Sequence, residues 1–590
     1  MTLSRLLRIR SDEREDGMAM VVVLGVTVML SALIVAGIAT STGAARQAQR
    51  DESWSASLAA AYAGIEEYES RLANDTGYFA YGNPAAPFTV ETGSSGKVAL
   101  PTGPSANPAF GVGTSGTWAT VPGSEGKAEF RYEVDNSRFY IDGTLRVRAT
   151  GRAGGATGDT RSIVADIKQK GFIDFLYFTD YEVRDPAALD PDDSTNCAIH
   201  HYEGARPGCT VIYFGGQDEI NGPMHTNDAF QTNGAAKFNG KVTTAYKAAT
   251  GKNYIKSSGT APTFKISTDP QNIATIGMPP TNSQLKKETR SDLPNEVPSP
   301  GCLYTGPTSI TFHADGTMTV VSPWTRFTNT SGVADALGSN PTHCGEPGNG
   351  GLAARSGSKY VGENIPVPAN LVVYVQNVPS SSTNKNYTNG TKPPFPSSAS
   401  TCATSSNSIG YPQSGEKVPF SKAYGCRNGD LFVSGTISGN ATLASENYIY
   451  VTGDIKYSDD AEDMLGLVGN NAVWVWNPVN SSSQPQLTKN RRIDAAILSV
   501  GHTFLVQNYD KGSSNRGTLT VNGAIAQKYR GPVGTGSGAS MSTGYAKDYN
   551  YDERFRYMAP PKFLSPVTTT YGVNVWVEVE PGFAPDGSAS

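Results

Sequence analysis

The sequence predicts a mainly β protein carried on one long N-terminal helix, with a small antiparallel sheet on that helix and a parallel β-helix-like domain beyond it. Three observations predict this fold. An apolar, uncharged stretch near the N-terminus continues into an amphipathic pattern, apolar residues alternate with period two between about residues 85 and 170, and a five-residue glycine motif recurs further on. The 590 residues include 64 Gly and 37 Pro but only 9% aromatic residues, which is typical of short strands joined by many turns.

Length and charge narrow the functional classes. A chain of 590 residues is too long for one compact domain. The net charge is −5, and no Lys/Arg run occurs after the N-terminal region. We therefore expect no nucleic-acid partner.

The N-terminal stretch predicts one transmembrane helix. No charged residue occurs from Met18 to Ala45, and Met18 to Ala39 is almost wholly apolar. At about 1.5 Å per residue that span reaches roughly 33 Å, enough to cross a hydrocarbon core of roughly 30 Å. More arginines precede the span than closely follow it, which places the N-terminus in the cytoplasm and exports the body of the chain. These arginines are Arg5, Arg8, Arg10 and Arg14 before it, and Arg46 and Arg50 after it.

The helix is predicted to continue beyond the membrane. Apolar residues recur at three- and four-residue steps, and no proline occurs before Pro84. The apolar stripe consists of Leu58, Ala61, Tyr62, Ile65, Tyr68 and Leu72. A single helix of about 55 residues therefore leads from the membrane into the exterior.

Three period-two segments predict strands of a small sheet. They contain Phe130, Tyr132 and Val134, then Leu145, Val147 and Ala149, then Ile163, Ala165 and Ile167. The glycine-rich segment Gly151 to Thr160 predicts an antiparallel hairpin between the last two. Packed on the amphipathic half of the helix, this sheet would complete a module over residues 18–170.

The N-terminal arrangement resembles the class III signal of type IV pilins, because a charged leader ending in Gly17 directly precedes the apolar helix. The segment AAAYAGIEEYESRL (Ala59 to Leu72) resembles PilX-like type IV pilus assembly proteins, as do FIDFLYFTDYEVRDP, GPMHTND and GYAKDYNYDERFRYMAPPKF further on. The resemblance implies a leader over residues 1–17 that the prepilin peptidase cuts between Gly17 and Met18. It also implies other pilins and the pilus assembly machinery as partners.

Two positions depart from that pattern. Met18 stands where the family usually has Phe, and Val22 stands where it usually has Glu. Some PilX-like proteins and K-type pseudopilins resemble this chain in lacking that Glu. A plain signal anchor, in which Gly17 precedes the apolar run by coincidence, is the alternative.

A five-residue motif (apolar, any, Gly, any, apolar) predicts stacked β-coils. It occurs as INGPM, FNGKV, VSGTI, VTGDI and VNGAI, beginning at Ile220, Phe238, Val433, Val451 and Val521. The first two and the next two each start 18 residues apart, close to one coil of a parallel β-helix with Gly at its sharp corner. A β-sandwich is the alternative. We expect this domain over residues 171–570, followed by a C-terminal tail over 571–590.

Asparagine recurs every six residues within this region, at Asn221, Asn227, Asn233 and Asn239. Each is followed by Gly or Asp, and such pairs readily adopt left-handed turns. The pattern predicts turns between very short strands. A polar ligand groove formed by stacked asparagines is the alternative.

The six cysteines predict three disulfides and an oxidising, extracytoplasmic compartment, because their number is even and neither CxxC nor a histidine at metal-ligand spacing occurs. Local pairing suits a coil whose contacts are mostly between neighbours. We therefore expect the pairs Cys197 with Cys209, Cys302 with Cys344, and Cys402 with Cys426.

The candidates for site chemistry are few. The carboxylates of Asp190, Asp192 and Asp193 form a weak Ca²⁺ candidate near other acidic residues and His200 and His201, but they lack EF-hand spacing. His225 and Asp228 could form an acid/base couple, although the turn chemistry around them favours a structural role. No phosphate-binding loop, nucleophile elbow, HExxH or dinucleotide motif occurs. We expect no catalytic residues, no metal and no cofactor.

We therefore expect a minor, tip-located, pilin-like component of a type IV pilus or related filament, acting in assembly, surface contact or adhesion. It would be a single-pass membrane protein with a cytoplasmic N-terminus and a body at the cell surface or on the pilus. The main alternative is a membrane-anchored β-helix enzyme that acts on surface polysaccharide. A third is an anchored surface protein unrelated to pili.

Overall fold

The computed structural model of the chain describes most of its residues. These are residues 16–75, 78–89, 98–103, 106–111, 117–139, 144–169, 171–186, 197–266, 269–294, 297–329, 341–397, 401–402, 406–419, 423–537, 540–556, 558–566 and 571–589.

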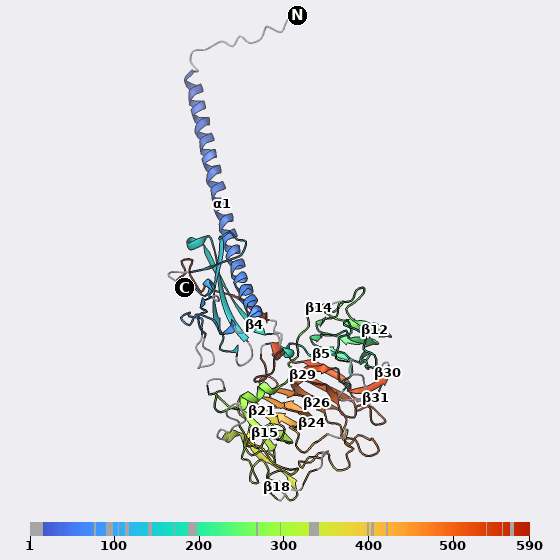
Figure 1. Ribbon diagram of the computed structural model, residues 1–590. Helices are drawn as coiled ribbons and strands as arrows, with labels where there is room; N and C mark the ends of the chain where they lie inside the picture. The colour runs from blue at the N-terminus through green and yellow to red at the C-terminus, as the bar shows by residue number, and fades with distance from the viewer. Residues whose placement is uncertain are drawn as a thin grey trace.

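A single long helix, α1 (Asp16–Asn74), projects from the body of the molecule (Figure 1). Its first half is exposed among the described residues, and its second half packs on the small sheet. An ion pair between Glu67 and Arg71, one turn apart, supports the last turns of the helix.

The small sheet has five antiparallel strands in the order β1-β2-β3-β4-β33. They are β1 (Ala119–Thr120), β2 (Ala128–Asp135), β3 (Thr144–Ala153), β4 (Asp159–Gln169) and β33 (Tyr571–Val579). The predicted hairpin joins β3 to β4, with Ala153 opposite Asp159. The expected separate tail over 571–590 is wrong, because β33 pairs with β4, with Trp576 opposite Ala165. The chain between β4 and β33 is thus inserted into this sheet.

The predicted helix stripe forms the core of this module. Ala61, Ile65, Tyr68 and Leu72 are fully buried against the alternating residues of β2, β3 and β4. Tyr62 differs from the prediction, since 39% of its surface stays exposed at the edge of the sheet.

The inserted domain is a stack of parallel coils. We define its middle turn, the composite coil, as β5 (Tyr177–Tyr181) with β32 (Ala546–Tyr551), two strands from opposite ends of the insertion. Both pair in parallel with β29 (Thr518–Tyr529) on one side. On the other side, β32 pairs with β7 (Glu219–Asn221) and β5 with β8 (Met224–Thr226). The chain therefore enters and leaves the stack at its middle, next to the small sheet (Figure 1).

Two arms extend from the composite coil. The short arm continues from β7 and β8 through β10 (Lys237–Phe238) and β11 (Val242–Thr244) to β13 (Thr263–Phe264) and β14 (Gln271–Asn272). A parallel side sheet, β6 (Tyr213–Gly215), β9 (Gln231–Asn233) and β12 (Ile255–Ser258), completes its coils.

The long arm contains the coils on the other side of the composite coil. Its parallel strands are β15 (Cys302–Thr305), β16 (Thr308–Phe312), β21 (Leu371–Gln376), β22 (Leu431–Ile437), β23 (Asn440–Ser445), β24 (Tyr448–Tyr457), β25 (Met464–Gly469), β26 (Ala472–Val475), β27 (Arg491–Ser499), β28 (Phe504–Val506) and β29. An antiparallel extension, β17 (Thr317–Val321) and β20 (Glu363–Pro366), pairs onto β16 at the far end. The remaining strands form two small hairpins, β18 (Arg355–Ser356) with β19 (Lys359–Tyr360) and β30 (Gly534–Ser537) with β31 (Ser540–Gly544).

The recurring glycine motif marks one corner of these coils. Phe238 pairs with Ile220 and Val451 with Val433, so the 18-residue steps are single coils and the predicted stacking is confirmed. Gly240 passes so close to the coil below that a Cβ there would lie 2.0 Å from the carbonyl oxygen of Gly222. Parallel pairing throughout the motif strands excludes the β-sandwich alternative.

The four periodic asparagines do follow very short strands, at the ends of β7, β8, β9 and β10. None of them adopts the left-handed conformation, which in this segment belongs to Gly234. Instead, Asn239 Nδ2 donates to Asn221 Oδ1 of the adjacent coil at 2.6 Å. The row continues across the stack through Asn550 and Asn522 to Asp494, each amide donating to the next oxygen. We call this row the asparagine ladder.

Three disulfides pair the cysteines in sequence order. The Cα–Cα distances are 5.6 Å for Cys197–Cys209, 5.4 Å for Cys302–Cys344 and 5.8 Å for Cys402–Cys426. Cys302 begins β15, so its disulfide fixes the segment around Cys344 to the coil at the end of the long arm.

Candidate functional site

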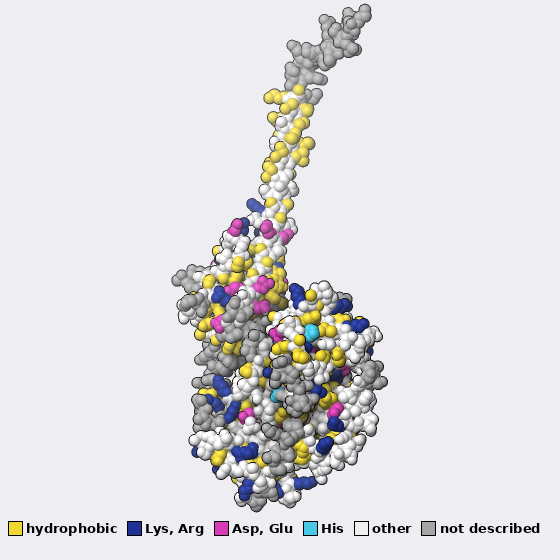
Figure 2. Space-filling view, turned by 45° about the vertical axis from the view of Figure 1, so that its right-hand side comes forward, with side chains coloured by type: hydrophobic (Ala, Val, Ile, Leu, Met, Phe, Trp, Pro, Cys, Tyr) yellow, Lys and Arg dark blue, Asp and Glu magenta, His cyan; other side chains and the backbone are white. Residues whose placement is uncertain are grey.

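The first half of α1 is an extended, exposed apolar surface. Every large apolar side chain from Met20 to Ile38 is at least 51% exposed. The helix is long and apolar enough to span a membrane, with a mean hydropathy of 2.7 over its most apolar window. In Figure 2 this segment carries no charged side chain until it approaches the small sheet. An exposed apolar surface of this size marks a membrane or protein interaction site.

Four hydroxyl groups in this half of the helix donate to backbone carbonyl oxygens of the helix itself. Ser31 Oγ donates to the carbonyl oxygen of Thr27 at 2.7 Å, and Thr42 Oγ1 donates to that of Ile38 at 2.8 Å. Thr27 and Thr40 bond back in the same way. Internal satisfaction of polar groups is what a hydrocarbon environment demands.

Gly17 and Met18, between which cleavage is expected, lie in the first turn of α1. Residues 1–15 of the expected leader lie outside the described residues. Val22, five residues into the expected mature chain, is 61% exposed on the apolar surface.

A second exposed patch lies where α1 meets the edge strand β33. The rings of Tyr62 and Trp576 are 4.9 Å apart, and both are about two-fifths exposed. Next to them, the Arg161 guanidinium lies 4.6 Å from the ring of Trp54 and pairs with Glu578. Aromatic residues with an arginine are the side chains enriched in protein interfaces.

The carboxylates proposed for Ca²⁺, Asp190, Asp192 and Asp193, lie outside the described residues. Neighbouring acidic groups are occupied by protein partners. Asp180 Oδ1 accepts from Asn227 Nδ2 at 2.8 Å and contacts His200 Nε2 at 3.2 Å. Fully buried Glu182 accepts from Arg530 at 3.0 Å. These contacts hold the coil together, and the oxygens involved are already hydrogen-bonded to protein groups.

His225 and Asp228 do not form the acid/base couple that their spacing allowed. The imidazole contacts Thr243 Oγ1 at 2.9 Å and Asn227 Oδ1 at 3.0 Å. Asp228 instead pairs with Arg206 and accepts from the backbone N–H of Glu182 at 2.9 Å. Burial lowers the pKa of His225 to about 4, so the imidazole is neutral near pH 7. The arrangement is structural.

One group of potential metal ligands occurs among the described residues: Cys302, His343 and Cys344. The two sulfurs are joined in a disulfide and supply no thiolate. His343 Nε2 lies 3.0 Å from the carbonyl oxygen of Pro300. The group therefore does not fit a metal centre.

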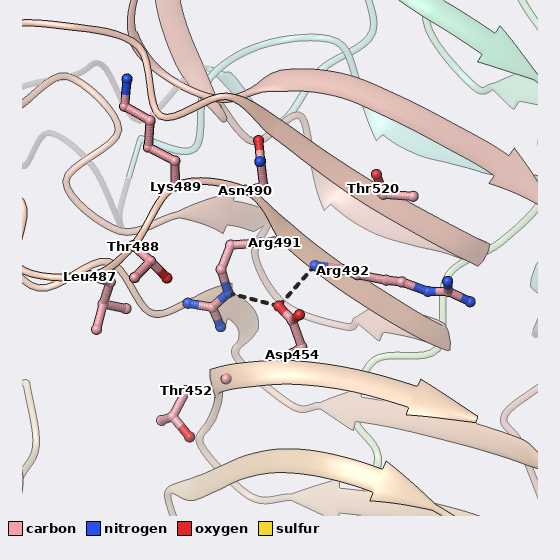
Figure 3. A pocket seen from close by; sticks show the side chains of 10 residues that line it. Thr452, Asp454, Leu487, Thr488, Lys489, Asn490, Arg491, Arg492 and Thr520 are labelled. Atoms are coloured by element: carbon pink, nitrogen blue, oxygen red, sulfur yellow. Dashed lines mark hydrogen bonds and ion pairs between the residues drawn. The ribbon is translucent and has the colours of Figure 1, made fainter. Parts of the chain in front are cut away.

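A cleft of about 510 Å³ opens on the long arm, between β24, β27 and the loop before β27 (Figure 3). Asp454 Oδ1 lies 3.7 Å from Arg491 Nε and accepts from the backbone N–H of Arg492 at 3.1 Å. Arg491 also donates to the carbonyl oxygens of Val451 and Trp476, while Arg492 pairs with Asp494. Asp454 and the Arg491 guanidinium thus connect successive coils, and the Arg492 guanidinium pairs within its own strand. None is placed as an acid, base or nucleophile.

The short arm is rich in exposed lysines. No Asp or Glu occurs from residue 229 to 268, whereas six lysines do, and all six are exposed. They are Lys237, Lys241, Lys247, Lys252, Lys256 and Lys265. Lys237 pairs with Glu219 of the adjacent coil at 3.6 Å. An excess of exposed lysine favours contact with negatively charged partners.

No known protein family is assigned to the chain by similarity. No family model and no curated protein matches the chain. Among solved structures, the competence-associated pilin ComZ from Thermus thermophilus aligns over 89% of this chain and 97% of its own, at 11% identity and a TM-score of 0.22. A likeness at that score carries no argument about this chain.

Proposed function

We propose that this protein is a minor, pilin-like component of a type IV pilus or related filament. The single observation that carries the proposal is α1, whose exposed first half has the length, apolarity and internally satisfied hydroxyls of a membrane span. One face of its second half is buried against a small antiparallel sheet. The first half of this helix thus spans the membrane, and its second half forms part of the core of the exported module.

Several finer features belong to the same proposal. The prepilin peptidase removes residues 1–17, the N-terminus faces the cytoplasm, and other pilins pack on the exposed half of α1. The protein carries no enzymatic activity, because the polar groups that sequence reasoning singled out within the described part of the chain brace its coils.

A position at the filament tip follows from two observations. Val22 offers no carboxylate to the free amine of a neighbouring subunit, and an unpaired charge in lipid is costly. The inserted coil stack is also far larger than the sheet that carries it, and it would crowd a helical lattice but not an end. At the tip, the exposed lysines of the short arm are available for contact with negatively charged surfaces.

Mass spectrometry of the mature chain tests the processing. We expect a chain that begins at Met18, and we expect Gly17→Leu to block cleavage. Gly25→Leu is the matched control, since no atom lies within 4 Å of a Cβ built there, and it should be processed normally. An intact N-terminus in the wild type would favour the plain signal anchor.

Immunogold labelling of sheared filaments tests the placement. Label at filament ends is the expected result. Regular label along the shaft would refute the tip position, and absence from filaments would refute the pilus proposal itself.

A further inference from the structure

Two charged residues occupy inward-facing positions at the seam between the composite coil and the short arm. β32 pairs with β7 so that Tyr549 lies opposite Ile220, and both side chains are buried inside the coil. Side chains alternate along a strand, so Lys547 and Asp218, each two residues earlier, share that inward face. The position equivalent to Lys547 in β29 is Leu519, which is fully buried. A lysine here breaks the apolar pattern and needs an explanation.

The amine and the carboxyl group are in contact. Lys547 Nζ lies 2.7 Å from Asp218 Oδ2, and the two side chains are only 11% and 13% exposed. This distance places the nitrogen about 3.5 Å from the carboxyl carbon, within the range of a near-attack geometry. Asp218 Oδ2 also accepts from the backbone N–H of Gly215 at 2.9 Å. That donor is aimed at the oxygen on which negative charge would develop during attack on the carbon.

The surroundings make the Lys547 amine easier to deprotonate. The Phe214 ring lies 5.9 Å from Lys547 Nζ, and the Arg530 guanidinium packs on the same ring at 3.5 Å. Arg530 is itself paired with Glu182, so these two buried charges largely compensate each other. Burial lowers the pKa of Lys547 and outweighs the nearby Asp218 carboxylate, which acts in the opposite direction; the charge of Arg530 lowers the pKa further. A lysine that releases its proton more easily is a better nucleophile.

We propose that Lys547 and Asp218 form an intramolecular amide bond that joins the composite coil to the short arm. Lys547 Nζ bonds to the carboxyl carbon of Asp218, and the bond from that carbon to Oδ1 breaks. Two of the three ammonium protons leave with Oδ1 as one water molecule, and the third remains on the amide nitrogen. Charge balances, because one ammonium and one carboxylate give a neutral amide and neutral water. No oxidant, reductant or other reactant is required.

The released water has a path out of the coil. A cleft of about 420 Å³ is lined by both Asp218 and Lys547 and opens to solvent beside Tyr213. Bringing two separate molecules together is a large part of the barrier to such a reaction. The fold holds the two reacting groups in contact and so removes that part of the barrier. The bond would tie together residues 329 positions apart in the sequence.

Intact mass spectrometry of the full chain, reduced and denatured, tests the proposal. The wild-type mass should be lower than the sequence mass by one water, and Lys547→Arg, which keeps the charge but cannot form the amide, should have the full mass. In Asp218→Asn the leaving group would be ammonia, so the mass of this variant should be lower than its sequence mass by one ammonia in place of one water. Peptide mapping should recover one branched peptide containing residues 218 and 547.

Two results would overturn the proposal. A wild-type chain at its full mass would show that the contact is an ordinary ion pair. A water loss that persists in Lys547→Arg would place the modification elsewhere, for example in a cyclised aspartate. Both readings use denatured protein, so they do not depend on whether the variants fold as well as the wild type.

Discussion

The two arms of the coil stack build the same geometry from different side chains. The long arm has strands of up to twelve residues and an interior dominated by Val, Ile and Leu. The short arm has strands of two to four residues around a cluster of phenylalanines, Phe214, Phe230, Phe238 and Phe264. Parallel coils can therefore rest on long backbone ladders with aliphatic layers, or on short ladders compensated by stacked rings and the asparagine ladder.

This difference predicts unequal stability within one domain. Each coil of the short arm contributes few backbone hydrogen bonds, so its stability depends more on a few large side chains. Local opening is expected to begin where such ladders are sparse. The following variants test that comparison, from the largest expected effect to the smallest.

Arg530→Ala should weaken both arms together. Arg530 is fully buried and donates to Glu182 and to the carbonyl oxygen of Ile212 at 2.9 Å, next to the composite coil from which both arms extend. Removing it leaves the Glu182 carboxylate buried and unpaired, which costs about 3–5 kcal/mol. Urea unfolding of the full chain in detergent measures the loss. The double variant Arg530→Met with Glu182→Leu should recover most of it; a single variant as stable as the wild type would contradict this role.

Phe238→Ala in the short arm and Leu467→Ala in the long arm should show that the two arms differ in how strongly their stability depends on one large side chain. Both side chains are buried, and each substitution is expected to cost about 3 kcal/mol. Hydrogen exchange followed by mass spectrometry should show faster exchange confined to residues 213–272 for Phe238→Ala, because the phenylalanine cluster carries that arm. Leu467→Ala should raise exchange only slightly and around its own coil. Equal, global acceleration in both variants would show that the stack unfolds as one unit.

Lower pH should change the stability of the two arms in opposite directions. Burial raises the pKa of Asp430 in the long arm to about 7, so its neutral form is favoured by folding and this contribution is lost as pH rises from about 4 through 7. Burial lowers the pKa of His225 in the short arm to about 4, so its contribution is lost as pH falls from about 6.5 through 4. The expected change in stability across its window is about 4 kcal/mol for Asp430 and about 3 kcal/mol for His225.

Hydrogen exchange of each arm at several pH values between 4 and 8 measures this response. Asp430→Asn should remove the pH dependence of the long arm and leave that of the short arm unchanged. A short arm that exchanges at the same rate at pH 4.5 and 6.5, after correction for intrinsic exchange, would show that His225 is not buried in its neutral form.

Asn522→Ala should have the smallest effect. It removes the donor to Asp494 at 2.7 Å and the acceptor for Asn550 in the asparagine ladder, at an expected cost of about 1 kcal/mol. Thermal unfolding measures the loss, with Thr518→Ala on the same strand as the control. A loss as large as that of Phe238→Ala would mean that the ladder holds the composite coil to the long arm as strongly as the ring cluster holds the short coils.

Local patterns in the sequence predicted local structure well. Period-two alternation identified β2, β3 and β4, and the motif glycines identified the coil corners, because both patterns reflect burial within a few residues. The composite coil and β33 could not be predicted in this way. Their partners, β29 with β5 and β4 with β33, are hundreds of residues apart, and no residue type marks a strand as the partner of another so distant.

The candidate site shows the same limit. The exposed apolar half of α1 was predictable from composition alone. The structural role expected for His225 and Asp228 is consistent with their contacts, because Asn227 and Arg206 engage the two side chains separately. The pairing of Lys547 with Asp218 was missed, since neither residue stands in a recognisable motif and only the strand register brings them together.

The return of the chain to its first sheet also sets an order in time. Gln169 lies opposite Tyr571, and the intervening chain, at roughly 5–20 residues per second, takes about 20–80 seconds to synthesise. Throughout that interval β4 lacks its partner strand β33. A chain that is cut short anywhere in the coil stack never covers that edge. Only a chain that includes β33 can therefore present the finished five-stranded sheet.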